Sequence, residues 1–288
     1  MSHRLPLASI LGAIVSVQAG AALAKGLFPA LGPVGTVGLR VVLSAIMLMA
    51  AFRPRLRALS WSQWRAVIPY GLILATMNIL FYLSLSRIPL GVAVTVEFIG
   101  PLAVAVFGSR RAVDIAWVVL AAAGIALITP WSGGGTDAFG VALALAAGVC
   151  WAGYILLGGR VSRIMPGGAS VATGMLIASF IAVPGAIATG GFERLTLPLF
   201  VAGAGVALLS SAVPYTLEMI ALKRLPARTF GILMSLEPAM AALLGVVVMH
   251  ELLSFRQWLA VALIIAASTG STLTSRRPAP VVAVESAL

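Results

Sequence analysis

The chain has 288 residues, of which 61% are hydrophobic and only 9% are charged, and its mean hydropathy is +1.09. Soluble domains are about 45–50% apolar and about 25% charged, so a chain of this composition cannot hide its apolar side chains in a water-soluble fold. The composition excludes a soluble protein and predicts an all-α protein that crosses a membrane several times.

The charged and sulfur-containing residues limit the possible chemistry. A formal net charge of +11 would suggest a nucleic-acid partner in a soluble chain, but here the charges lie in short gaps between apolar runs, where they set topology. The single cysteine, Cys150, excludes an internal disulfide framework. The only histidines, His3 and His250, provide no zinc site, and we expect neither a metal nor a cofactor.

Apolar runs of about 20 residues, the length needed to span a bilayer, recur along the whole chain. Ten such segments are predicted, at 7–27, 34–52, 66–86, 91–108, 113–130, 138–158, 170–190, 199–222, 228–249 and 255–274. The first is too long for a secretory signal peptide and lacks a clear cleavage site, so we expect it to be retained.

Basic residues are distributed unevenly over the gaps between these segments. Most of the 19 Lys and Arg residues fall in alternate gaps, namely Arg4; Arg53, Arg55, Arg57 and Arg65; Arg110 and Arg111; Arg160 and Arg163; Lys223, Arg224 and Arg228; and Arg276 and Arg277. The other gaps hold only Arg87, Arg194 and Arg256. Positive loops face the cytoplasm, so both termini are predicted to be cytoplasmic.

The two halves of the chain resemble each other at an offset of 137 residues. At this offset, segment 222–226 aligns with 85–89, Pro238 aligns with Pro101, and Gly245 aligns with Gly108. A similarity with such a long period indicates an internal duplication. We predict a first repeat over 1–134, a second repeat over 135–275, and a disordered cytoplasmic tail over 276–288.

Each repeat contains five predicted spans, an odd number, so the second repeat enters the membrane in the opposite direction to the first. Inverted repeats are typical of transporters that alternate access to a central site between the two faces of the membrane. A duplication that serves packing alone is the alternative.

Small residues recur every four positions in two predicted spans, which favours close contact between helix backbones. They are Gly140, Ala144, Gly148 and Ala152 in one span and Ala262, Ala266 and Gly270 in the other. This pattern predicts packing and does not indicate a substrate.

Charged side chains inside a bilayer are costly and usually mark function. Apart from charges in the first two residues of a span, five fall inside predicted spans: Lys25, Arg40, Glu97, Glu218 and Glu237. At about 1.5 Å per residue, Glu97 and Glu237 lie about 10–14 Å into their spans, near the middle of the membrane. Lys25 could instead reach the interface, and Glu218 could pair with basic residues of the neighbouring loop.

Both central carboxylates lie close to a proline, Glu97 four residues before Pro101 and Glu237 directly before Pro238. A proline inside a helix leaves a carbonyl one turn back without its partner and allows bending. Loss of hydration at such a position favours the neutral form of a carboxylate, so both residues are candidates for carrying a coupling proton or binding a substrate ammonium. A structural pair with Arg40 is the alternative.

Uncharged polar and aromatic side chains are predicted in the same region, where they suit the wall of a small-solute cavity. They are Gln18, Asn78, Tyr82, Trp151, Tyr154, Ser210, Ser211 and Tyr215. Asn78 and Tyr215 occupy equivalent positions in the two repeats. Trp and Tyr also collect at membrane interfaces, which fits Trp61 and Trp64 better.

Five segments, spread from the first predicted span to the last, carry a family resemblance. They are SVQAGAALAKGLFP at 16–29, PLGVAVTVEFIGPLAVAVFGSRRAVDIAWVVLA at 89–121, CWAGYIL at 150–156, PYTLEMIALKRLPARTFGILMSLEPA at 214–239 and IIAASTGSTLT at 264–274. Through them the chain resembles the drug/metabolite transporter superfamily, in particular its ten-helix type built from two EamA repeats. The loops at 131–137 and 159–169 and the tail after Arg277 depart most from the family pattern.

The resemblance implies a multi-pass protein of the bacterial inner membrane that exports small amino acids of the threonine and homoserine type, driven by the proton gradient. The charges fit a zwitterion, because a carboxylate can bind Arg40 or Lys25 and an ammonium can bind Glu97 or Glu237. An exporter of another metabolite or a drug is the alternative. An intramembrane enzyme is less expected, since one cysteine and no membrane-embedded histidine supply neither a nucleophile with its base nor metal ligands.

Overall fold

The computed structural model describes residues 4–106, 112–128, 137–165, 167–214, 217 and 236–274. The predictions for Tyr215 and Glu218, for the loop residues Arg110, Arg111, Lys223, Arg224 and Arg228, and for the tail after residue 275 lie outside these residues. Within the described ranges the regular elements are all helical. They are α1 (Arg4–Phe52), the 3-10 turn η1 (Leu56–Ala58), α2 (Trp61–Leu85), α3 (Leu90–Glu97), α4 (Ile99–Val106), α5 (Ala112–Ile128), α6 (Ala138–Ile164), α7 (Gly167–Ala188), α8 (Leu197–Ala207), the π-helical turn η2 (Leu208–Ala212), α11 (Glu237–Met249) and α12 (Phe255–Thr274).

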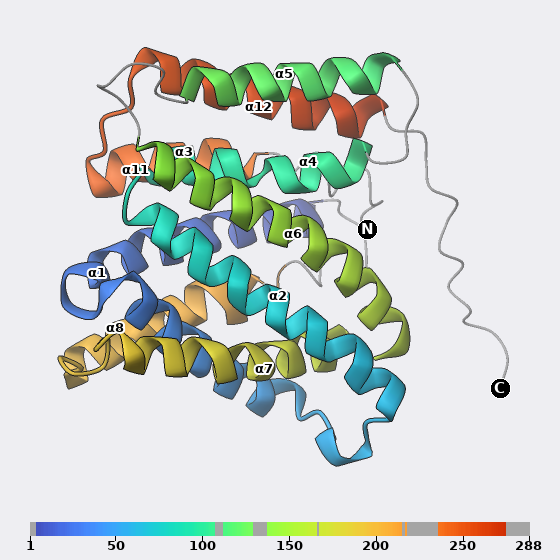
Figure 1. Ribbon diagram of the computed structural model, residues 1–288, viewed down its shortest axis with the longest axis vertical. Coiled ribbons are helices and arrows are strands. Elements are labelled where there is room, and N and C mark those ends of the chain that lie inside the picture. The colour runs from blue at the N-terminus through green and yellow to red at the C-terminus, as the bar shows by residue number, and fades with distance from the viewer. Residues whose placement is uncertain are drawn as a thin grey trace, which may run out of the picture.

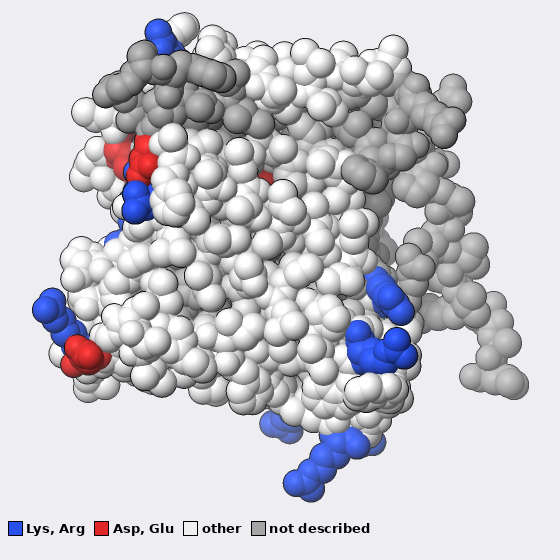
Figure 2. Space-filling model, viewed as in Figure 1, with Lys and Arg blue, Asp and Glu red and all other residues white. Residues whose placement is uncertain are grey.

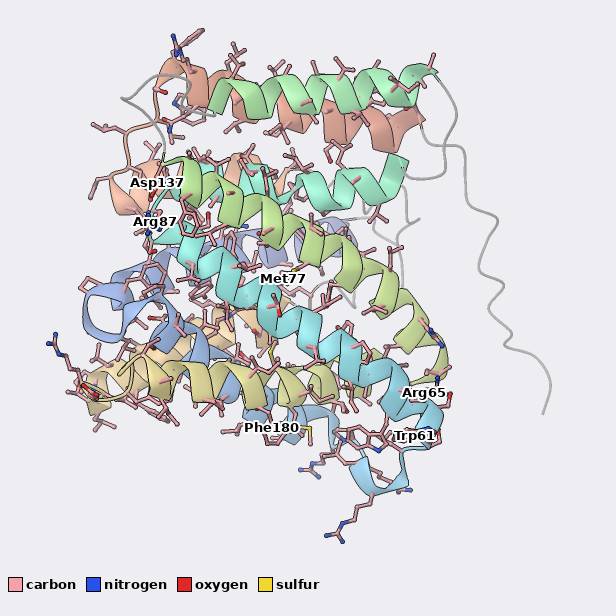
Figure 3. All side chains as sticks on the ribbon, in the orientation of Figure 1. Trp61, Arg65, Met77, Arg87, Asp137 and Phe180 are labelled. Atoms are coloured by element: carbon pink, nitrogen blue, oxygen red, sulfur yellow. The ribbon has the colours of Figure 1, made fainter. Side chains whose placement is uncertain are left out.

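Several of these helices have the length and composition of membrane spans. Among the described residues, Ala8–Phe52, Trp61–Leu85, Ala138–Gly158 and Gly168–Ala188 are long and apolar enough to cross a bilayer. Shorter apolar helices lie in the described parts of the other predicted segments. Large apolar side chains also point outward, such as Phe180, which is 71% exposed (Figure 3). This surface suits lipid, and it confirms the prediction of an all-helical membrane protein.

Helix α1 is bent into two arms at Gly32. Its backbone angles there are φ 69° and ψ 167°, a left-handed conformation that glycine adopts without strain. The hydroxyl of Thr36 donates to the Gly32 carbonyl at 2.7 Å. Figure 1 shows the N-terminal arm running to one edge of the bundle and the C-terminal arm returning. The two arms correspond to the predicted segments 7–27 and 34–52.

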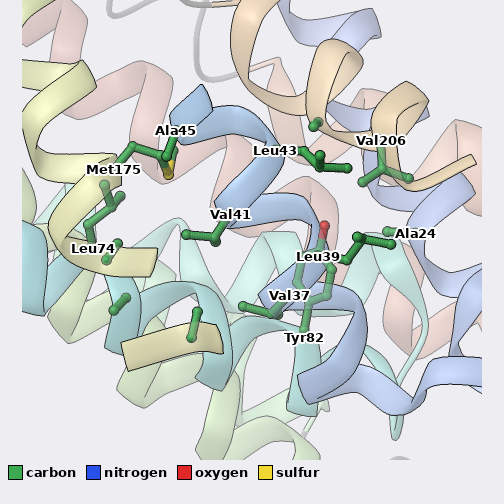
Figure 4. Packing of buried hydrophobic residues seen from close by; sticks show 14 of the residues in the cluster. Ala24, Val37, Leu39, Val41, Leu43, Ala45, Leu74, Tyr82, Met175 and Val206 are labelled. Atoms are coloured by element: carbon green, nitrogen blue, oxygen red, sulfur yellow. The ribbon is translucent and has the colours of Figure 1, made fainter. Parts of the chain in front are cut away.

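The C-terminal arm of α1 is the centre of the largest apolar cluster. Val37, Val41 and Ala45, spaced by one helical turn, lie on the side of α2 and α7, and Leu43 lies toward Val206 of α8 (Figure 4). A spacing of four residues keeps these side chains on one face of the helix, so a single helix contacts neighbours from both halves of the chain.

Helices α5 and α12 form an antiparallel pair along one edge of the bundle (Figure 1). Trp117 near the start of α5 donates from its indole nitrogen to the Thr274 hydroxyl at the end of α12, at 2.9 Å. Further along, Gly124 of α5 lies against Ile264 of α12. The order of contacts reverses from one helix to the other, which establishes the antiparallel direction.

Two further pairs meet in the same antiparallel manner through glycines. In α3 and α11, Gly91 lies against Ala242 and the neighbouring Leu90 lies against Gly245. The C-terminal arm of α1 packs on α7, where a side chain added at Gly38 would meet Ala186. Small residues here let the helix backbones approach each other closely.

The predicted small-residue faces are only partly found. On α6, Gly140 lies against Ile88, and a Cβ atom added to Gly148 would lie 2.7 Å from the Glu97 carbonyl oxygen, so this prediction is confirmed. On α12, Gly270 packs against Trp117 of α5, but Ala262 and Ala266 are exposed, so the predicted contact is found for Gly270 and is wrong for the two alanines. The buried stripe of α12 instead runs through Ala260, Ile264 and Ala267. Spacing by four does not reveal which face of a uniformly apolar helix meets a neighbour.

Candidate functional site

A buried arginine lies between the two halves of the chain. Arg40 of α1 is 8% exposed, and its Nε donates to the Ser210 hydroxyl at 2.7 Å. One terminal nitrogen approaches the Ser210 carbonyl oxygen at 3.4 Å, and the other donates to the Asn78 side-chain oxygen. The Tyr82 ring centre lies 5.5 Å from the guanidinium carbon. These acceptors are uncharged, so they fix the guanidinium without neutralising it.

The π-helical turn η2 presents Ser210 to Arg40. In a π-helical turn the backbone bond spans five residues, as it does from the Val213 N–H to the Leu208 carbonyl, and such turns are frequent at functional sites. The Ser210 hydroxyl also donates to the Val206 carbonyl at 2.6 Å, and the next residue, Ser211, contacts the Ser44 hydroxyl at 3.0 Å. The sequence places both serines in this region but does not mark Ser210 as the partner of Arg40.

Two buried carboxylates lie at the ends of two short helices. Glu97 is the last residue of α3 and is 8% exposed, and Glu237 is the first residue of α11 and is 7% exposed. The side-chain nitrogen of Gln18 donates to Glu237 at 3.0 Å. Glu97 lies within the electrostatic reach of both Glu237 and Arg40. The fold therefore brings one cation and two carboxylates together from α1, α3 and α11.

The helix breaks directly after Glu97, as Pro101 predicts. Phe98 separates α3 from α4, and Pro101 has no N–H to bond the Glu97 carbonyl four residues earlier. The backbone of Gly148 on α6 fills the space beside that carbonyl. Next to it, the Trp151 ring meets Phe98 edge-on, with ring centres 5.4 Å apart.

Glu237 and Pro238 form the first turn of α11. The segment before it, 218–235, lies outside the described residues, so the kink expected at Pro238 stays a prediction. Proline is well tolerated in the first helical turn. An acidic side chain there interacts favourably with the positive end of the helix dipole. Glu97 lies at the opposite end of its helix and has no such support.

The remaining candidate side chains have distinct surroundings. The Asn78 amide nitrogen donates to the Leu74 carbonyl at 2.7 Å, which orients its oxygen toward Arg40. Gln18 is 3% exposed, and among the described residues its side-chain oxygen has no hydrogen-bond partner. Tyr154 stacks on Tyr70 with ring centres 5.1 Å apart. Gln18 contacts Glu237, and Asn78 and Tyr82 contact Arg40, so these three side chains lie beside the buried charged groups.

Lys25 contacts a different group of residues. Its ammonium forms an ion pair with Glu251 and approaches the Ile88 carbonyl oxygen at 3.4 Å. Glu251 follows α11 and was not among the predicted site residues. The repeat offset could have identified it, because it places Glu251 at the position of another acidic residue, Asp114.

A second ion pair joins Arg87 to Asp137 at 2.7 Å on the exposed surface (Figure 3). Asp137 also accepts hydrogen bonds from the Phe139 and Gly140 N–H groups and so caps the start of α6. The hydrogen bond from Arg87 lowers the pKa of Asp137 below its usual value. Arg65 and Trp61 lie at the opposite end of the bundle (Figure 3).

Comparison with known proteins identifies the family. A model of the EamA-like transporter family matches residues 138–273. The threonine/homoserine exporter RhtA of Salmonella typhimurium (strain LT2) is 51% identical over 278 residues, which cover 95% of this chain and 93% of that protein. RhtA of Escherichia coli (strain K12) is 50% identical over the same share of both chains. The chain belongs to the EamA-like transporter family.

A solved crystal structure has the same fold as this EamA-like transporter. The two are 22% identical, the TM-score is 0.60, and the match covers 92% of this chain and 96% of that chain. Family membership confirms the predicted resemblance, the multi-pass membrane location and the expectation of a transporter and not an enzyme. Among the described residues, no group of three His, Cys, Asp or Glu side chains could hold a metal ion.

Proposed function

We propose that this EamA-like transporter exports threonine and homoserine from the cytoplasm across the bacterial inner membrane, with the proton as coupling ion. Relatives that are 50–51% identical over 95% of the chain are threonine/homoserine exporters. The observation that carries the proposal is the buried combination of Arg40 with Glu97 and Glu237, since a zwitterionic substrate needs both signs of charge in one place.

The substrate carboxylate binds Arg40 in this proposal. A guanidinium has five N–H donors in a planar fork that matches a carboxylate. Contacts with Ser210 and Asn78 use three of them, and two remain for the substrate. Because its direct hydrogen-bond partners, Ser210 and Asn78, are neutral, the guanidinium keeps its positive charge, which attracts an arriving carboxylate strongly in a region of low dielectric.

The ammonium and the hydroxyl of the substrate have separate partners. The ammonium lies between Glu97 and Glu237. The side-chain oxygen of Gln18 is fixed by the hydrogen bond from its own nitrogen to Glu237, and it accepts the substrate hydroxyl. Valine has the shape of threonine but no hydroxyl, so its binding would leave the buried Gln18 oxygen without a hydrogen-bond donor. The site therefore favours threonine over valine.

Glu97 is the proton carrier in this mechanism. Glu237 is stabilised as the charged form by the Gln18 donor and by the start of α11. Glu97 sits at the end of α3 without these contacts, so it is the carboxylate that can change its protonation state during the cycle. Direct alternation between a bound proton and a bound ammonium at Glu97 couples the two fluxes.

Alternating access arises from ten spans arranged as two inverted five-helix repeats, 1–134 and 135–275, with both termini in the cytoplasm. Equivalent helices of inverted repeats run in opposite directions. The adjacent antiparallel pairs α1 with α7, α3 with α11 and α5 with α12 support this arrangement.

A second pair of contacts follows the same symmetry. Helix α2 packs on α6, where the Ser84 hydroxyl donates to the Gly140 carbonyl at 2.8 Å. In the other repeat, the corresponding elements α8 and η2 pack on the N-terminal arm of α1. There the Ser16 hydroxyl donates to the Leu209 carbonyl at 2.6 Å. Arginines gathered near η1 and the start of α2, visible in Figure 2, support a cytoplasmic location of that end.

Accumulation of labelled threonine in everted membrane vesicles tests the function. Export from the cytoplasmic face becomes uptake in such vesicles, and an acidic interior should drive it. We expect a protonophore to abolish the accumulation, homoserine to compete strongly, and valine to compete at least about tenfold less well. Vesicles without the protein are the control. Threonine uptake no higher than in that control would contradict the proposal and leave export of another metabolite or a drug.

A further inference from the structure

The ion pair between Lys25 and Glu251 connects the two halves of the chain at one end of the bundle. Both side chains are largely buried, with 22% and 11% of their surfaces exposed. His250, with φ 54°, turns the chain sharply after α11, and the Glu251 N–H bonds to the Gly245 carbonyl at 3.0 Å. The position of Glu251 is therefore fixed by its own backbone and not only by Lys25.

Glu251 makes a second contact, with the first residue of α3. Its other carboxylate oxygen accepts the Leu90 N–H at 2.8 Å, from 161 positions away in sequence. The residue before α3, Pro89, offers no side-chain cap. Glu251 thus supplies the cap that α3 lacks locally, and its negative charge suits the positive end of that helix.

The surface between α3 and α11 is closed at this end. A Cβ atom added to Gly245 would collide with the carboxylate of Glu251. Gly91 of α3 lies directly against Ala242 of α11. Leu90 is 0% exposed and Ile88 is 2% exposed. The two helices are therefore in close contact where Lys25, Glu251 and the Leu90 amide meet.

The same two helices carry the central carboxylates. Leu90 begins α3 and Glu97 ends it, about 10 Å away at 1.5 Å per residue. Glu237 begins α11, and Glu251 follows its end. A change in the contacts of Glu251 therefore acts on two short helices whose other ends hold the proposed proton carrier and its partner.

We propose that Lys25 and Glu251 form the outer gate of the transporter, closed in this conformation and opened to release substrate. The gate rests on the proposed alternating access, but not on the identity of the substrate or of the coupling ion. Glu251 acts as a positioning residue: it holds α3 against α11 through Leu90 and touches no substrate. At the repeat offset, Asp114 and Gly108 take the positions of Glu251 and Gly245, so both repeats contain an acid six residues after a glycine.

Accessibility of a reporter cysteine tests the gate. In a Cys150→Ser background, Leu90→Cys is expected to react slowly with an impermeant maleimide added to intact cells. Addition of Glu251→Gln, which removes the charge that holds Lys25, should raise the labelling rate several-fold. Ile88→Cys serves as a second reporter, because its carbonyl and not its side chain contacts Lys25.

Asp137→Asn is the matched control. It removes the other ion pair, to Arg87, while asparagine can still cap α6. We expect no increase in labelling of either reporter. Equal increases in both variants would show general loosening and would overturn the gate, as would unchanged labelling in Glu251→Gln. An increase seen only in everted vesicles would place the pair on the cytoplasmic face and would also overturn it.

Cross-linking gives an independent measurement. Lys25→Cys with Glu251→Cys, joined by a reversible bifunctional methanethiosulfonate, should lose efflux and regain it after reduction. Full efflux by the cross-linked protein would overturn the gate. The labelling experiment needs no substrate, so a gate that opens normally in a protein that does not transport threonine would contradict only the proposed function. Threonine accumulation together with unchanged labelling would contradict only the gate.

Discussion

Arg40 and Ser210 lie 170 positions apart in the chain, and the Arg40 Nε donates to the Ser210 hydroxyl at 2.7 Å. The contact joins the C-terminal arm of α1 to the π-helical turn η2, one element from each predicted repeat. A second residue of the first repeat, Asn78, holds another nitrogen of the same guanidinium. The arginine is therefore held at the boundary between the two halves, where a rocking motion of one repeat against the other would change its surroundings.

Arg40→Lys should reduce threonine transport about tenfold or more, because an ammonium cannot make the planar contacts to Ser210 and Asn78 and still bind a carboxylate in two places. Arg40→Ala should abolish transport. The measurement is threonine uptake into everted vesicles, normalised to the amount of protein in the membrane. Arg87→Lys, at the exposed ion pair, is the control and should transport normally. Unimpaired transport by Arg40→Ala would remove this residue from the site.

The proposed topology places Asp137 outside the cell and Arg160 in the cytoplasm. Cysteines introduced one at a time at these positions, in a Cys150→Ser background, should differ in their reaction with an impermeant maleimide. In intact cells only position 137 should be labelled, and in permeabilised cells both should be. Labelling of position 160 in intact cells would contradict the ten-span arrangement.

Gly148→Ala should destabilise the protein, since the added methyl group would lie 2.7 Å from the Glu97 carbonyl oxygen. Overpacking of this kind costs about 1–3 kcal/mol. Gly185→Ala is the matched control: its methyl group meets only Val34, at 3.6 Å, and alanine favours a helix by about 1 kcal/mol relative to glycine. Thermal unfolding in detergent should show a lower midpoint for the first variant and an equal or higher midpoint for the second.

The ion pair of Asp137 and Arg87 predicts a small pH dependence of stability. The hydrogen bond from Arg87 lowers the pKa of Asp137 in the folded protein, so its contribution is present above the usual pKa of aspartate, about 3.9, and is lost as the pH falls through the lower folded value. Wild type should unfold at a higher temperature than Asp137→Asn at pH 7, and the two should converge at strongly acidic pH. A constant difference would show that another contact of Asp137 is responsible.

Many of the helices could be predicted from the sequence, because the length of an apolar run is a local property. Pro101 predicted the break after Glu97 for the same reason, since the missing N–H is a property of that residue alone. The partner of Arg40 could not be predicted, because a serine in a π-helical turn looks like any other serine in an apolar segment. Lys25 was placed with the substrate site because its partner, Glu251, comes from a turn 226 positions away. The buried face of α12 was missed since both of its faces are apolar.

Glu97 is the residue on which the coupling proposal depends. It is buried at the end of α3, near Arg40 and Glu237, and the helix dipole does not stabilise its charge as it does for Glu237. A proton carrier must bind and release a proton in each cycle. Glu97→Gln keeps the size and the hydrogen-bonding capacity of the side chain but cannot change its protonation state.

Two transport modes separate the possible roles of Glu97. If it carries the proton, Glu97→Gln should lose uptake driven by a pH gradient. Because Glu237 can still bind the ammonium, the variant should continue to exchange labelled for unlabelled threonine between equal pools, which requires no net proton movement. If it only binds the ammonium, both modes should fail, and threonine should no longer raise the unfolding temperature. Glu237→Gln is the matched comparison. Glu237 is proposed to remain charged and to bind the ammonium throughout the cycle, so this variant should lose both transport modes. Wild-type rates of both modes in Glu97→Gln would show that Glu97 has a structural role, and would leave Glu237 as the carboxylate to test for coupling.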